Sequence, residues 1–222
     1  MRPVKDWKKQ RVINQYNAFE KRVFIFCEGK KTEPNYFEGI KRHIERNIIY
    51  KNKILIMIEG VGAETLGVLK HAIEYVQINE ISDSDIWIVY DKDSFPAERF
   101  NRVCYDVDQL NMNQKKVRYH VAWSNQCIEY WFILHFDYYE SDNDRQCYIA
   151  YLNSKFKTLG LDKYEKNDPL IFERLFKHGN PLQAVKHAAK RIECFHNATP
   201  SDMAPATTVH NLYSRLNIYF PS

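Results

Sequence analysis

The stretch Val23-Phe24-Ile25-Phe26-Cys27-Glu28-Gly29-Lys30-Lys31-Thr32-Glu33-Pro34 decides the fold class. Its first five residues are a continuous apolar run, which predicts a strand buried on both faces, as strands of parallel sheets are. The strand ends at Glu28-Gly29. Thr32 is then expected to cap a helix that has Pro34 in its first turn and runs to about Arg46.

The same alternation of a buried strand and an amphipathic helix recurs three more times along the chain. The expected strands cover residues 54–58, 85–90 and 117–123, and the helices that follow them begin near Leu66, Pro96 and Cys127. Strands that alternate with helices indicate a parallel sheet covered on both faces and joined by right-handed crossovers. The sequence therefore predicts an α/β fold with a parallel sheet of about four strands.

Beyond Asp137 the expected elements are all helical, and they cover residues 145–159, 169–177, 181–195 and 207–219. Gly160 suits a helix end, and Asn180-Pro181 suits a helix start. We interpret this half as a cap on the sheet. The predicted organisation is a basic arm over residues 1–20, an α/β core over 21–137 and a helical cap over 138–222, packed on the core as part of the same domain or as a subdomain.

Composition is that of an ordinary globular protein. Of the 222 residues, 45% are hydrophobic and 27% are charged, and the net charge of +4 is too small to establish a polyanionic partner. Lysines and arginines crowd the N-terminal stretch. A basic arm that contacts phosphates and a solvated terminus both account for this crowding.

The five cysteines form neither a zinc-binding nor a disulfide pattern, because no two of them stand at Cys-x-x-Cys spacing. We interpret them as reduced thiols of a cytoplasmic protein. No signal peptide opens the sequence, and no apolar run reaches the roughly 18 residues of a membrane span. We therefore expect a cytoplasmic protein without a membrane partner.

Three acids follow the ends of predicted strands: Glu28 follows the first, and Asp91 and Asp93 follow the third. Ligands of open parallel sheets bind outside the carboxyl ends of the strands, so these acids are expected to converge. Two carboxylates that share a face suit Mg²⁺ or Mn²⁺, and Glu28 either completes the metal shell or acts as the general base. The pattern predicts metal-dependent phosphodiester cleavage; solvated turn acids are the alternative.

A strand ending in Glu-Gly followed by a strand ending in Asp-x-Asp resembles the TOPRIM domain of topoisomerases, bacterial primases, recombination proteins and OLD-type nucleases. Longer motifs are similar to those of the RloB family and extend from the first strand nearly to the C-terminus. These motifs are Phe26-Cys27-Glu28-Gly29-Lys30-Lys31-Thr32-Glu33-Pro34-Asn35-Tyr36-Phe37, Tyr90-Asp91-Lys92-Asp93-Ser94-Phe95, Ser124-Asn125-Gln126-Cys127-Ile128-Glu129-Tyr130-Trp131, His135-Phe136 and Pro205-Ala206-Thr207-Thr208-Val209-His210.

The resemblance implies a TOPRIM fold, divalent-metal chemistry and an association with restriction and phage-defence loci, where related TOPRIM effectors act as nucleases. It carries Glu28, Asp91 and Asp93 over as the TOPRIM acids. Similarity to OLD-type nucleases makes Glu33 a candidate ligand of a second metal. Some TOPRIM proteins have a third acid two residues beyond the pair. Here that position is Phe95, so the number of metals stays open.

Five residues near the acids are secondary candidates. Glu129 lies in a very apolar helix, where it either binds a second metal or joins a salt bridge. His135 is a candidate proton shuttle, with a structural histidine as the alternative. Lys30, Lys31 and Lys92 stand beside the acids and are candidates for phosphate contacts, although Lys92 points away if it alternates with the aspartates.

Two other motifs are weaker. The stretch Gly29-Lys30-Lys31-Thr32 does not form an ATP-binding P-loop, because Phe24 occupies the place of the first glycine and Lys31 that of the Ser or Thr after the lysine. Thr207-Thr208-Val209-His210 has no evident chemistry, and helix capping is the default reading.

Two functions of different classes remain. The first is a Mg²⁺-dependent nuclease that hydrolyses phosphodiester bonds in RNA, tRNA included, or in DNA. It would serve as an abortive-infection effector in phage defence, controlled by a regulatory partner or a phage trigger. The second is a non-catalytic TOPRIM module that binds nucleic acid or a partner. Three converging acids favour the nuclease. The substrate, the trigger and the oligomeric state stay open.

Overall fold

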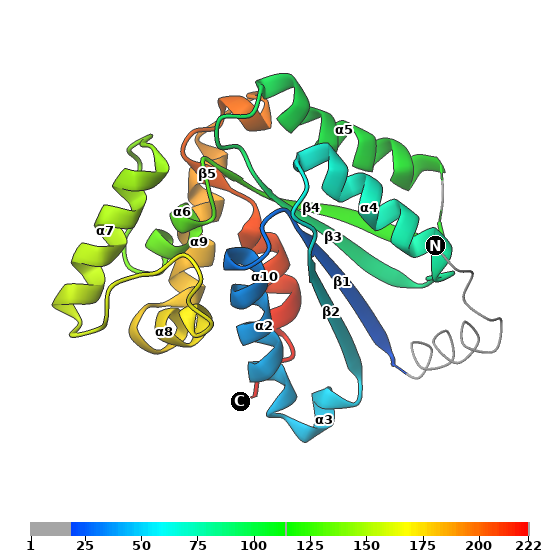
Figure 1. Ribbon diagram of the computed structural model, residues 1–222, viewed down its shortest axis with the longest axis horizontal. Helices are drawn as coiled ribbons and strands as arrows, with labels where there is room; N and C mark the ends of the chain where they lie inside the picture. The colour runs from blue at the N-terminus through cyan, green and yellow to red at the C-terminus, as the bar shows by residue number, and fades with distance from the viewer. Residues whose placement is uncertain (1–18, 114, 222) are drawn as a thin grey trace.

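The computed structural model describes residues 19–113 and 115–221, so the basic arm expected over residues 1–20 lies almost entirely outside the described part. A five-stranded sheet forms the centre of the molecule (Figure 1). Its strands are β1 (Lys21–Cys27), β2 (Ile54–Gly60), β3 (Ser84–Asp91), β4 (Val117–Asn125) and β5 (Ala206–Thr207). The strand order is β2-β1-β3-β4-β5, in which the first four strands are parallel and β5 is antiparallel to β4. The predicted α/β class is confirmed.

Helices cover both faces of this sheet. They are α2 (Thr32–Glu45), α3 (Ile48–Lys51), α4 (Thr65–Ile78), α5 (Ala97–Asn113), α6 (Glu129–Leu134), α7 (Arg145–Thr158), α8 (Ile171–His178), α9 (Pro181–Glu193) and α10 (Val209–Asn217), with a short 3-10 turn at Pro200–Asp202. Figure 1 shows α4 and α5 on one face and α2 and α10 on the other, with α6 to α9 beside α2. In the described part of the chain, no helix has the length and apolarity needed to cross a bilayer.

The strands separate two hydrophobic cores. Successive side chains of a strand point to opposite faces, so Phe24 and Phe26 pack with α4 and α5, while Ile25 packs with α2. Buried residues of the C-terminal helices, such as Leu152 and Leu175, belong to the same core as those of α2. The C-terminal helical region is therefore anchored in the core on which α2 and the sheet depend.

Three local predictions are wrong. Thr32 does not cap α2, because it is the first helical residue and its hydroxyl donates to the backbone carbonyl of Lys166 at 2.6 Å. The sheet has a fifth strand, because Ala206–Thr207 pairs with the end of β4 and the last helix begins only at Val209. The helix expected to begin near Cys127 begins at Glu129 instead, and it has only six residues.

The order of the strands fixes where a ligand can bind. β1 lies between β2 and β3, so the chain leaves β1 towards one side for β2 and returns to its other side for β3. The carboxyl ends of β1 and β3 flank this switch point, which is the place where open α/β sheets bind ligands. The backbone N–H of Glu28 donates to the carbonyl of Val89 at 2.9 Å, which holds the two strand ends together.

Candidate active site

A cleft of about 420 Å³ opens at the carboxyl ends of β1 and β3. Its lining residues are Glu28, Gly29, Lys30, Lys31, Thr32, Glu33, Asp91, Asp93, Ile128, Glu129, Arg145, Lys166 and Asn167. Seven of the nine residues that the sequence singles out for the site are among them. Five are carboxylates, which come from the ends of two strands and from the first turns of α2 and α6.

The Glu-Gly pair after β1 has a steric reason. A Cβ atom at position 29 would stand 2.2 Å from Oε2 of Glu33, so a larger residue would displace that carboxylate from its position in the cleft. Gly62 has a φ of +68°, and a Cβ there would stand 2.1 Å from Cε of Lys30. The two glycines therefore let the chain place Glu28, Glu33 and the Lys30 stem together at one strand end.

Asp91 and Asp93 reach the cleft through a tight turn. Asp91 ends β3 and is 4% exposed; its N–H donates to Oε2 of Glu28 at 3.2 Å, and its Oδ2 accepts from the N–H of Ile128 at 3.2 Å. Asp93 has a φ of +39°, which aspartate tolerates better than most residues, and its N–H donates to the carbonyl of Gln126. The turn directs both aspartates towards the same cation.

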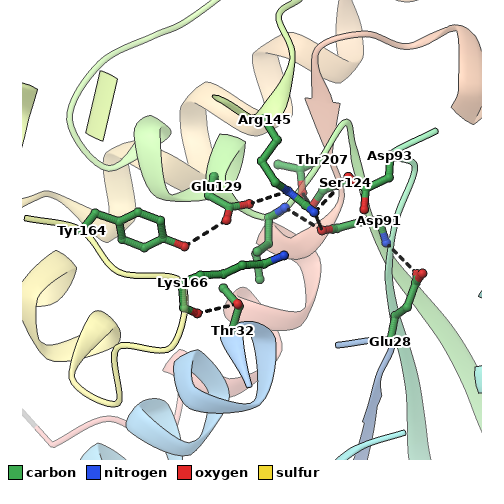
Figure 2. A network of polar contacts seen from close by, with 11 residues as sticks. Glu28, Thr32, Asp91, Asp93, Ser124, Glu129, Arg145, Tyr164, Lys166 and Thr207 are labelled. Atoms are coloured by element: carbon green, nitrogen blue, oxygen red, sulfur yellow. Dashed lines mark hydrogen bonds and ion pairs between the residues drawn. The ribbon is translucent and has the colours of Figure 1, made fainter. Parts of the chain in front are cut away.

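That cation is Arg145, which sequence analysis did not identify (Figure 2). Its Nη2 lies 2.9 Å from Oδ2 of Asp91 and 3.0 Å from Oδ1 of Asp93, and its Nε lies 3.6 Å from Oε2 of Glu129. Arg145 is the first residue of α7, after the N-cap Asp144. A cation in the first turn of a helix is disfavoured by the helix dipole, so Arg145 needs acidic partners from elsewhere in the chain. This unfavourable position was the one signal in the sequence that pointed to such partners.

The C-terminal region supplies the rest of the wall. Glu129 is completely buried, and its Oε1 accepts from the hydroxyl of Tyr164 at 3.0 Å. Its Oε2 has no hydrogen-bond partner among the described residues. The bond from Thr32 to the Lys166 carbonyl ties the segment of Tyr164 and Lys166 to the start of α2, and the Lys166 side chain lines the cleft (Figure 2).

Electrostatics shows that the carboxylates are insufficiently compensated. Burial raises the pKa of Glu28 from its ordinary 4.5 to about 7, and the nearby Glu33 and Asp93 add to this effect. Burial and Glu33 also raise the pKa of Asp91 well above its usual range, although Arg145 opposes them. Burial likewise raises the pKa of Glu33 and of Asp93. The cleft therefore favours an additional positive charge.

A divalent cation fits this donor set in chemistry and charge. Among the described residues, no three acidic, histidine or cysteine side chains converge as a ready-made metal shell. Mg²⁺ does not need one, since it commonly takes one or two carboxylates and completes its shell with water and substrate phosphate. Asp91, Asp93 and the unpartnered oxygen of Glu129 are the oxygen donors best placed for such an ion, and Arg145 contacts all three residues.

Two predicted residues lie outside the cleft. The ammonium of Lys92 donates to the backbone carbonyl of Phe95, as expected if its side chain points away from the aspartates. His135 is buried, with Nδ1 at 2.9 Å from the Trp131 carbonyl, and burial lowers its pKa to about 4. The structure therefore does not bring Lys92 and His135 to the acids.

The Thr207-Thr208 pair joins the C-terminal helix to the sheet. Thr207 donates its hydroxyl to the carbonyl of Trp123 at 3.0 Å, and Thr208 accepts from the N–H of Trp123 at 2.9 Å. Thr208 is the N-cap residue of α10 but makes no side-chain capping bond, whereas the Thr207 hydroxyl accepts from the N–H of Val209. Thr207 therefore caps α10, and the same hydroxyl also attaches this segment to β4.

Comparison with known proteins agrees with the motifs. A family model described as RloB-like protein matches residues 23–216, which is most of the chain. The match includes all five acids of the cleft as well as Arg145 and Lys166. No curated protein and no solved structure matches the chain. The chain belongs to the RloB-like family, which confirms the resemblance seen in its motifs.

Proposed function

We propose that this RloB-like protein is a divalent-metal-dependent nuclease with TOPRIM-type acids at its active site. The observation that carries the proposal is the cleft at the switch point of the sheet, where five carboxylates meet. There the completely buried Glu129 has an oxygen without a hydrogen-bond partner in the described part of the chain. Lys30, Lys31 and Lys166 line the same cleft. Acids for a metal beside cations for phosphates are the groups that phosphodiester hydrolysis requires.

Each residue has a distinct role in this proposal. Asp91 and Asp93, together with the second oxygen of Glu129, would hold the cation, and Glu33 is the candidate ligand of a second one. The bound cation supplies charge neutralisation at the scissile phosphate and a lowered pKa of water. Glu28 accepts the proton of the attacking water, because the N–H of Asp91 fixes its carboxylate beside the two aspartates.

Lysines at the cleft support a nucleic acid as the substrate. Lys30 and Lys31 precede α2, and Lys166 comes from the segment between α7 and α8. Ammonium groups at the rim of a cleft that holds acids suit the phosphates next to a scissile bond in RNA, tRNA included, or in DNA. Family membership supports a role in restriction or phage defence, in which a toxic nuclease acts under the control of a partner or a phage trigger.

The test is a cleavage assay on the native protein. Labelled single- and double-stranded DNA, total RNA and tRNA are incubated with Mg²⁺, Mn²⁺ or a chelator. The variants Asp91→Asn and Glu28→Gln remove one charge each. The control Glu59→Gln changes an acid near the end of β2 whose carboxylate contacts His71 at 2.8 Å and which lies outside the cleft.

The proposal expects metal-dependent cleavage that both cleft variants lose and the control keeps. Cleavage that survives both cleft variants would place the chemistry elsewhere. Nucleic-acid binding that needs no metal, with no cleavage of any substrate, would favour the non-catalytic binding module.

A further inference from the structure

Arg145 is held at the cleft by tertiary contacts alone. It begins α7, where the helix dipole disfavours a cation. The N-cap Asp144 uses its carboxylate for the N–H of Cys147 and so anchors the helix start without holding the guanidinium. What keeps Arg145 in place is the pair of aspartates that follows β3, 54 residues earlier in the chain.

The contacts of Arg145 resemble those of a point charge. An arginine usually meets a carboxylate through two parallel N–H groups. Here the single nitrogen Nη2 serves both Asp91 and Asp93, at 2.9 and 3.0 Å. Its Nε and the facing Oε2 of Glu129 are both buried, and neither has a hydrogen-bond partner among residues 19–113 and 115–221. The single charge of the guanidinium is therefore shared among three carboxylates, and its Nε makes no hydrogen bond within the described residues.

We propose that Arg145 is a displaceable stand-in for the divalent cation. Its guanidinium offsets part of the charge of Asp91, Asp93 and Glu129 in the metal-free protein and must leave them when the ion binds. This inference rests on the proposed function, because it assigns a metal to the same acids. Two cations at one set of oxygens repel each other, so the ion and the guanidinium compete.

Two of the three acids, Asp91 and Glu129, have anchors that do not depend on Arg145. The carboxylate of Asp91 accepts from the N–H of Ile128, and Glu129 is held by the hydroxyl of Tyr164. When the guanidinium leaves, the oxygens stay in place for the incoming ion. The exchange thus needs movement of one side chain at the start of α7 and no rearrangement of the sheet.

Competition predicts that removing the guanidinium tightens metal binding. If the state with Arg145 displaced makes up about a tenth of the metal-free protein or less, Arg145→Gln lowers the dissociation constant for Mn²⁺ about tenfold or more. The matched control is Arg174→Gln. Arg174 and Arg145 have side chains that are each 24% exposed, and Arg174 pairs with the buried Asp168 at 3.1 Å outside the cleft.

The experiment is a calorimetric titration of four full-length proteins with Mn²⁺: native, Arg145→Gln, Arg174→Gln and Asp91→Asn. We expect tighter binding in Arg145→Gln, native affinity in Arg174→Gln and no binding in Asp91→Asn. Equal or weaker binding by Arg145→Gln, with Asp91→Asn still losing it, would overturn the displacement and leave the metal site standing. Absence of Mn²⁺ binding in the native and Arg145→Gln proteins alike would overturn the proposed function as well.

A second measurement uses the native protein, so it does not depend on a variant that folds. Phenylglyoxal modifies accessible guanidinium groups, and peptide mass analysis reports each arginine separately. Mn²⁺ is expected to increase modification of Arg145 several-fold and to leave Arg174 unchanged. Saturating Mn²⁺ without an increase at Arg145 would show that ion and guanidinium occupy the cleft together, contrary to the proposal.

Discussion

The pKa values of buried aspartates are shifted in opposite directions at the two ends of the parallel sheet. At the amino end, Asp85 of β3 is hydrogen-bonded by His120 of β4 at 3.2 Å and by Arg215 of α10 at 2.8 and 3.1 Å. Burial works against the charged form of Asp85, but these partners outweigh it and lower its pKa to about 2. At the carboxyl end, burial raises the pKa of Asp91 well above its usual range although Arg145 contacts it.

The difference between the two ends lies in the balance of charge. One carboxylate with two basic partners stabilises the fold at the amino end, since its charged form is preferred in the folded state. At the carboxyl end, five carboxylates share one cleft with Arg145 and three lysines, and burial there disfavours the charged form of the acids. Proteins keep buried, poorly compensated acids mainly where a ligand or a reaction uses them. The contrast therefore supports the proposal that places the functional site at the carboxyl end.

The largest expected effect is on catalysis. Glu28→Gln removes the proposed proton acceptor and should lower the rate of metal-dependent cleavage by about 10²- to 10⁴-fold. Asp85→Asn, at the other end of the same sheet, should leave the rate almost unchanged at temperatures where the variant is folded. Initial rates on one labelled substrate measure both. A similar loss of cleavage rate in both variants would show that the two ends of the sheet do not differ in function.

The free energy of unfolding should depend on Asp85, which the cleavage rate does not need. The pKa of Asp85 falls from its ordinary 3.8 to about 2, and its side chain is only 18% exposed. At roughly 1.4 kcal/mol per pKa unit, Asp85→Asn should lower the free energy of unfolding by about 2 kcal/mol at pH 7. Urea unfolding measures the change. A variant as stable as the native protein would show that the contacts of Asp85 with His120 and Arg215 do not contribute to stability in solution.

The stabilisation by Asp85 depends on pH. Because the folded-state pKa of Asp85 is depressed, its stabilisation is fully present above about pH 4 and is lost as the pH falls towards 2. The difference in unfolding free energy between native protein and Asp85→Asn should shrink over that range. Unfolding curves at successive pH values test this, and a difference that stays constant down to pH 2 would contradict it.

The smallest expected effect is a gain in the free energy of unfolding when a charge is removed at the carboxyl end. Glu33 is 6% exposed, and burial and the neighbouring Glu129 raise its pKa. Glu33→Gln keeps the shape and removes the buried charge, so in a chelator it should raise the free energy of unfolding by about 1 kcal/mol. Chemical unfolding without metal measures it. A loss of stability instead would mean that the Glu33 charge is well compensated.

The convergence of the acids could be predicted from sequence because it follows from topology. Glu28 and Asp91 stand directly after continuous apolar runs, and the ends of adjacent parallel strands meet at one edge. The apolar runs themselves gave the four parallel strands. Neither inference needs knowledge of any side-chain contact.

Other features could not be predicted because they depend on contacts between distant segments. Arg145 meets Asp91 across 54 residues, and the hydroxyl of Thr32 meets the Lys166 carbonyl across 134 residues instead of capping its own helix. The strand Ala206–Thr207 has only two residues, too few to show any periodicity, and exists through its pairing with β4.

Thermal melting of three proteins in Mn²⁺ and in chelator tests the central claim most directly. The account predicts that Mn²⁺ raises the melting temperature of the native protein, because an ion that binds only the folded state stabilises it. It predicts that Asp91→Asn loses this rise and that Asp85→Asn, starting from a lower melting temperature, keeps it in full. A native protein whose melting temperature is the same in Mn²⁺ and in chelator would contradict a metal site at the carboxyl end of the sheet.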